Sequence, residues 1–236
     1  MTRSQDSILI VLTNTHQLLG SHRTGFNVKE VAHLHECLCK SGHSNLIFAS
    51  PKGGETFIDP FSLKSSEHDE TVQKFIKDSE AMQMVKNTKR LDEINLENVC
   101  CAVFPGGPGT LFDLPNNHRV SEIVQQVWER NNGYIATIGH GIAALLNVKS
   151  PKGDHELWLR GKRVTCNTVE EEQEMQLDKA LPFMLEQKLR EIGVKFEKAN
   201  KFQSNVVMEE KLITGQNCNS TKEWVQHVVK CVGKHN

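Results

Sequence analysis

The stretch Tyr134–Leu145, which reads YIATIGHGIAAL, is the most informative segment of this sequence. Its first five residues are mostly β-branched or apolar, which is typical of a short buried strand, and the residues from Ile142 onward favour a helix. Gly139, His140 and Gly141 stand between the two, so the chain must turn abruptly. In hydrolase-type sheets such a turn is a nucleophile elbow, which presents one side chain at the top of the sheet. We therefore expect residue 139 to lie at the apex of a sharp bend.

The rest of the chain continues this alternation of short apolar runs and longer amphipathic segments. It predicts further strands at Ser7–Leu12, Asn45–Ala49, Val99–Phe104, Arg163–Cys166, Ser204–Met208 and Lys211–Thr214. It predicts helices at Gly25–Lys40, Arg119–Arg130, Glu171–Ile192 and from Thr221. Such a pattern indicates an α/β fold with a doubly wound, mostly parallel sheet of the flavodoxin-like type and helices on both faces. We expect residues 1–236 to form a single domain, with the polar residues 55–98 as an excursion of one or two helices.

Composition excludes several classes of function. The formal net charge is −1, which gives no electrostatic support for binding nucleic acid or an anionic membrane surface. No apolar run approaches the roughly 20 residues of a membrane-spanning helix, and Ile8–Leu12 is too short for a signal-peptide core. The seven cysteines include no CxxC pair, so the sequence indicates neither a metal site nor a dithiol motif. We expect a reduced, cytoplasmic protein without a metal or cofactor.

The elbow is similar to the Cys-His-Gly elbow of the ThiJ/PfpI superfamily, whose members are class I glutamine amidotransferase-like. Its members include glutathione-independent glyoxalases, deglycases, proteases and chaperones. Four more blocks match in order and spacing: Gly25-Phe26 with Glu30, Phe48-Ala49-Ser50-Pro51 with Asp59-Pro60, Pro105-Gly106-Gly107-Pro108-Gly109, and Leu212–Asn217. The resemblance implies that Glu30 places a carboxylate beside a nucleophilic thiol, as in the glyoxalase-like branch. It also implies that backbone amides at Gly107 and Gly141 face a ligand oxygen.

Gly139 departs from this pattern, because it stands where the superfamily has its cysteine. A glycine has no group that can attack a carbonyl, whereas covalent catalysis of this kind needs a thiolate. Another branch of the superfamily also reads Gly-His-Gly, and its members can be subunits of larger assemblies, including one at early endosomes. We therefore expect a pseudoenzyme that acts as a binding or assembly subunit, and a homo-oligomer because the superfamily is commonly dimeric. The alternative is a glyoxalase- or deglycase-type lyase acting on methylglyoxal or similar small carbonyls; a holdase chaperone is a third class.

The remaining candidate residues each have two interpretations. His140 is either a ligand contact or a buried polar group satisfied by a neighbour. Cys166 is either a displaced thiol or a small residue at a strand end. The glutamates Glu170 and Glu172 are candidates for orienting His140, but Thr168-x-x-Glu171 also forms a capping box, which alone explains acidic residues here.

Overall fold

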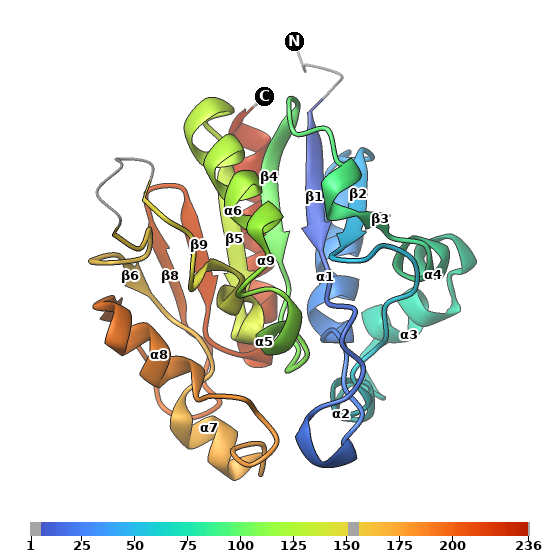
Figure 1. The fold of residues 1–236 in the computed structure, drawn as a ribbon. Coiled ribbons are helices and arrows are strands. Elements are labelled where there is room, and N and C mark those ends of the chain that lie inside the picture. The colour runs from blue at the N-terminus through green and yellow to red at the C-terminus, as the bar shows by residue number, and fades with distance from the viewer. Residues whose placement is uncertain (1–5, 151–155, 236) are drawn as a thin grey trace.

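The computed structural model describes residues 6–150 and 156–235. Seven strands form one sheet in the order β3-β2-β1-β4-β5-β9-β8 (Figure 1). Their bounds are β1 Ser7–Val11, β2 Leu46–Ser50, β3 Lys89–Arg90, β4 Val99–Phe104, β5 Tyr134–Ile138, β8 Val206–Glu209 and β9 Leu212–Gly215. All neighbours pair in parallel except β8, which is antiparallel to β9. The predicted doubly wound, mostly parallel α/β fold is confirmed.

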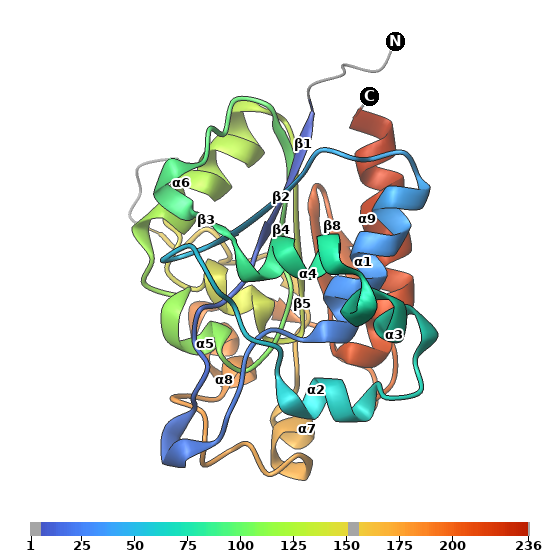
Figure 2. The same ribbon diagram turned by 90° about the vertical axis from the view of Figure 1, so that its right-hand side faces the viewer.

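Helices cover both faces of this sheet (Figure 2). On one face lie α1 Val28–Lys40, α3 Glu70–Lys77, α4 Ser79–Lys86 and α9 Thr221–His235. On the other lie α5 Thr110–Asp113, α6 His118–Gln125 and α8 Leu185–Ile192. Successive residues of a strand point to opposite faces, so Ile8 and Ile10 enter the first core whereas Leu9 and Val11 enter the second. Because both faces are buried, the central strands β1, β4 and β5 are nearly continuous apolar runs.

The polar excursion at residues 55–98 holds more structure than its sequence predicts. It contains α2 Pro60–Ser65, α3, α4, the short strand β3 and a 3₁₀ turn at Leu91–Glu93. Val72 and Phe75 are buried, and α3 packs on α1. The expectation of one or two helices was therefore too low, because short helices with at most two buried residues each give little hydrophobic periodicity.

The predicted helix Glu171–Ile192 was wrong. The chain forms α7 Val169–Glu174 and α8, and the residues between them are turns. Gln176 adopts a left-handed backbone with φ of 57°, and Pro182 cannot donate a helical hydrogen bond. The predicted strand at Arg163–Cys166 is only β6 Arg163–Val164, which pairs with β7 Lys195–Phe196 in a separate two-stranded sheet.

Two helices differ in type from the expectation. The segment after β5 is a 3₁₀ helix, Gly139–Leu145, rather than the start of an α-helix. The predicted helix Arg119–Arg130 is α6 followed by a π-helical turn at Gln126–Arg130. None of the helices in the described residues has the length and apolarity to span a bilayer.

Candidate functional site

The elbow lies where β5 ends. Ile138 is extended, with φ of −143° and ψ of 144°, and Gly139 then turns with φ of +55° into the 3₁₀ helix. A positive φ is strained for any residue with a side chain, and glycine adopts it without that cost. Position 139 is thus the apex of the bend between strand and helix.

Asn167 occupies the space that a side chain at position 139 would need. Its Oδ1 atom lies 2.8 Å from the place where a Cβ atom on Gly139 would be, closer than real Cβ contacts. Asn167 is 7% exposed, and no described residue hydrogen-bonds its side-chain amide. It lies between β6 and Thr168, the cap of α7. Sequence reasoning missed this residue, because nothing in the pattern around 167 indicates that it meets the elbow.

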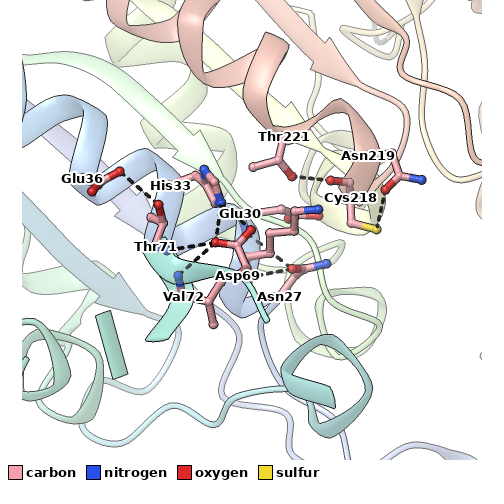
Figure 3. Close-up of polar contacts among 11 residues, drawn as sticks. Asn27, Glu30, His33, Glu36, Asp69, Thr71, Val72, Cys218, Asn219 and Thr221 are labelled. Carbon is pink, nitrogen blue, oxygen red and sulfur yellow. Dashed lines mark hydrogen bonds and ion pairs between the residues drawn. The ribbon is translucent and has the colours of Figure 1, made fainter. Parts of the chain in front are cut away.

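Glu30 reaches the same point from the first turn of α1. Asn27 caps this helix by accepting hydrogen bonds from the backbone N–H groups of Lys29 and Glu30 (Figure 3). Glu30 is 1% exposed; its Oε2 accepts a 2.6 Å hydrogen bond from the Gly106 N–H, and its Oε1 is 3.6 Å from the empty Cβ position at Gly139. Burial raises the pKa of Glu30 to about 8, against the lowering effects of the Gly106 N–H and His140. Glu30 is therefore protonated at neutral pH.

His140 forms a buried pair with Glu172. The His140 Nε2–H donates to Glu172 Oε1 at 2.6 Å, and both side chains are almost completely buried. Burial lowers the pKa of His140, but the charge of Glu172 and its hydrogen bond outweigh this, so the pKa lies above 6.5. The contact with Glu172 therefore favours the protonated form of His140.

The other two glutamates of the acidic run, Glu170 and Glu171, do not contact His140. Thr168 and Glu171 form the capping box of α7, with Oε2 of Glu171 accepting from the Thr168 N–H. Glu170 is exposed. Each interpretation of the acidic run therefore holds for one residue. Glu171 caps the helix, Glu172 contacts His140, and Glu170 does neither.

The two candidate glycines differ in their surroundings. Gly107 lines the cavity described below; its φ is +120°, and a Cβ atom there would collide with the Gly25 carbonyl oxygen. A Cβ atom on Gly141 would collide with the carbonyl oxygen of Phe104, the last residue of β4. Close packing of the elbow on β4 is thus enough to explain a glycine at position 141.

Two cysteines, Cys166 and Cys218, lie near the elbow and are candidates for a reactive thiol. Cys166 is buried in the apolar core, where its S–H donates to the Asn167 carbonyl oxygen at 3.0 Å, and it is not among the cavity-lining residues. Cys218 does line the cavity, together with Glu30 and His140. Burial, and then the charge of Glu30, raise the pKa of Cys218 above 9.0, so this thiol is a weak nucleophile at neutral pH. We did not predict Cys218, although the Leu212–Asn217 block ends directly before it.

These groups share one cavity of about 530 Å³, a size typical of small-molecule sites. Its polar residues include Glu30, His140 and Asn167. Its apolar side chains are Leu18, Pro60, Phe61, Pro108, Met175 and Leu177. Within the described residues, no group of three or more His, Cys, Asp or Glu side chains is arranged to hold a metal ion.

The chain is similar in sequence to a known protein family and to several named proteins. The family model described as the DJ-1/PfpI family matches residues 61–231. Glutathione-independent glyoxalase hsp3101 of Schizosaccharomyces pombe is 27% identical over 217 residues, which cover 88% of this chain and 87% of the relative. Glutamine amidotransferase-like class 1 domain-containing protein 1 of Xenopus laevis is 28% identical over 218 residues, covering 92% and 90%.

A solved structure has the same fold over nearly the whole chain. Rapid Encystment Protein 24 kDa of Francisella tularensis superposes with a TM-score of 0.89 at 31% sequence identity. The match covers 96% of this chain and 99% of that one. The resemblance predicted from the sequence is confirmed, and both of its branches are similar to this chain to nearly the same degree.

Proposed function

The chain belongs to the DJ-1/PfpI family, and we propose that it is a non-catalytic member that binds a small molecule in the elbow cavity without forming a covalent bond to it. The observation that carries this proposal is the pairing of Gly139 with Asn167. Position 139 has no nucleophile, and the Asn167 amide fills the space beside it. Losing the nucleophile of a catalytic group that works as a unit costs several orders of magnitude in rate.

Neither nearby thiol is well suited to replace the missing one. Cys166 is in the core, and burial raises its pKa well above 9.0. Cys218 also has a raised pKa, so it is mostly protonated at neutral pH. A protonated thiol is a poor nucleophile, which supports reversible binding over covalent chemistry.

A glyoxalase-type activity is the second candidate, because the other site residues are kept. Protonated Glu30 and the His140–Glu172 pair face one cavity, and groups of this kind transfer protons in general acid–base catalysis. The similarity to a protein named glutathione-independent glyoxalase favours small carbonyl compounds as its substrates.

Lactate formation from methylglyoxal separates the two candidates. The wild type is compared with His140→Ala and with Glu170→Gln, an exposed control, using the Schizosaccharomyces pombe glyoxalase as the active reference. We expect no turnover above buffer by any form of this chain. Turnover by wild type and Glu170→Gln that is lost in His140→Ala would establish the second candidate instead.

The proposal includes a role as a subunit of a larger assembly in the cytoplasm. It rests on the similarity to the glutamine amidotransferase-like protein and on the resemblance to a branch whose members can be subunits of larger assemblies, including one at early endosomes. Sedimentation of the purified chain tests homo-oligomer formation. Mass spectrometry of proteins that co-purify with the native chain tests assembly; recovery of the chain alone, in monomeric form, would contradict this part.

A further inference from the structure

Two unpaired polar groups flank the place of the missing side chain. Glu30 Oε1 and Asn167 Oδ1 lie 3.6 and 2.8 Å from the Cβ position at Gly139, and no described residue hydrogen-bonds either atom. Both side chains are more than nine-tenths buried and line the cavity. Buried polar groups in proteins are almost always satisfied. Both groups line the open cavity, so a ligand bound there can complete their hydrogen bonds.

The two groups have opposite hydrogen-bonding character. Glu30 Oε2 accepts the Gly106 N–H and so behaves as the carbonyl oxygen of the acid, which leaves the proton on Oε1. Glu30 thus offers an O–H donor, and the Asn167 atom that faces position 139 is its carbonyl acceptor Oδ1. A ligand group that satisfies both must present an acceptor and a donor side by side.

The charges of the residues beside Gly139 favour a neutral ligand group over an anion. Glu30 is neutral in its acid form, and the His140 ring already has Glu172 as its acidic partner. Asp59, which also lines the cavity, accepts hydrogen bonds from the Ser62 N–H and the Thr24 hydroxyl. These residues leave no unpaired positive charge for a carboxylate beside Gly139. The exposed Arg23 lines another part of the cavity, so an anion has a competing place there.

On the premise of the proposed function, we propose that the cavity binds a primary carboxamide with a hydrocarbon substituent. The ligand N–H donates to Asn167 Oδ1, and the ligand C=O accepts the Glu30 Oε1–H. The hydrocarbon packs against Leu18, Phe61 and the other apolar side chains of the cavity. An aldehyde or ketone leaves Asn167 Oδ1 without a donor, and an alcohol must serve both groups with one oxygen. Asn167 is thus the residue that determines specificity.

Isothermal titration with three matched probes tests this assignment. Hexanamide has both the donor and the acceptor, N,N-dimethylhexanamide lacks the donor, and hexanoate carries a charge. At pH 7 we expect hexanamide to bind at least tenfold more tightly than either of the others. Equal or tighter binding of hexanoate or the dimethyl amide, or no binding of hexanamide, would overturn the proposal.

Two variants assign the contacts. Asn167→Leu, which keeps the volume, is expected to reduce hexanamide affinity to that of the dimethyl amide, whereas the exposed control Glu170→Gln leaves it unchanged. Loss of affinity in both variants, or in neither, would contradict the role of Asn167. Wild-type affinity is expected to fall above pH 8 as Glu30 loses its proton. Glu30→Gln keeps an N–H donor at every pH, so its affinity should not fall.

Other titrating groups near Glu30 are His140, Asp59, Lys29 and Cys218. A decline in hexanamide affinity above pH 8 that persists in Glu30→Gln would belong to one of these groups and would refute the donor role of Glu30.

Incubation of the protein with hexanamide also tests the proposed function separately. Release of ammonia and hexanoate during incubation would overturn the non-catalytic proposal even if the amide preference held. A lack of hexanamide binding without any turnover would refute only the ligand assignment.

Discussion

Asn167 Oδ1 lies 2.8 Å from the position of a Cβ atom on Gly139, so the two residues are sterically coupled across the elbow. The space that a side chain at position 139 would need is occupied by an amide from a different segment of the chain. The neighbouring His140 contacts Glu172 rather than Asn167.

Replacing Gly139 by alanine should reveal this coupling. The variant combines backbone strain at φ of +55° with the Asn167 contact, and strain of this kind costs about 1–3 kcal/mol. Gly42→Ala is the matched control, because Gly42 has φ of +82° and no atom near its Cβ position. We expect Gly139→Ala to lower the melting temperature more than Gly42→Ala does.

The double variant Gly139→Ala with Asn167→Ala isolates the contact. Removing the amide should make the glycine substitution cost about as much as it does at Gly42, as judged from denaturant unfolding. The coupling free energy between positions 139 and 167 should then be about 0.5–3 kcal/mol. Strictly additive effects would show that the two residues do not compete for space.

Protonation of Glu30 should make stability depend on pH. In the unfolded chain this carboxyl ionises near pH 4.5, whereas in the folded chain burial holds its pKa at about 8. Between these values the folded state binds more protons, so stability falls as pH rises, with a limiting slope of about 1.4 kcal/mol per pH unit. Glu30→Gln should lack this component in unfolding measured from pH 4.5 to 8. A variant with the slope of the wild type would contradict the raised pKa.

The His140–Glu172 pair gives a pH dependence of its own. The pKa of His140 lies above 6.5, so its stabilising contribution is complete below that pH and is lost as pH rises through the folded value. Glu172→Gln should lower the pKa of His140, because burial then acts without the opposing charge. Nuclear magnetic resonance of the imidazole proton measures this; an unchanged pKa would disprove the ion pair.

Replacing His140 by alanine should lower the free energy of unfolding. His140→Ala leaves the Glu172 carboxylate buried without its charge partner, and breaking a buried pair costs about 3–5 kcal/mol. His68→Ala is the control, because the His68 side chain is almost fully exposed. Denaturant unfolding at pH 6 should show a large loss for His140→Ala only. Similar small losses in both variants would argue against the pair.

Much of this site could be predicted from the sequence. The strand, turn and helix around Gly139 identify the elbow, and the family resemblance makes a glutamate of the acidic run a candidate to contact His140. These features are local or depend on strand order, which hydrophobic periodicity reveals. Gly139 could be placed at the apex of the bend because it stands between the predicted strand and the predicted helix.

Asn167 and Cys218 could not be found in this way. Asn167 lies in the irregular segment between β6 and α7, and Cys218 begins a short 3₁₀ helix before α9. The direction of such short segments depends on tertiary packing rather than on a repeating pattern. The helix predicted over Glu171–Ile192 failed for a related reason, because the chain turns between α7 and α8, where Gln176 has a left-handed backbone and Pro182 lacks an N–H donor. In the folded chain the turn before α8 helps to form the cavity, with Met175 and Leu177 on its wall.

Iodoacetamide labelling tests whether the site can still activate a thiol. In Gly139→Cys with Asn167→Ala, the new cysteine has room beside Glu30 and His140, whose positive charge favours a thiolate. We expect faster labelling at pH 7 than at Cys39, an exposed thiol of the same chain. Labelling no faster than at Cys39 would mean that the pocket no longer supports a thiolate.

The most direct measurement is the rate of lactate formation from methylglyoxal by the wild type and by Gly139→Cys with Asn167→Ala in one assay. We expect no turnover by the wild type, because position 139 has no nucleophile, and measurable turnover once a thiol and the space for it are restored. Turnover by the wild type at a rate equal to or above that of the double variant, abolished by His140→Ala, would contradict the non-catalytic assignment.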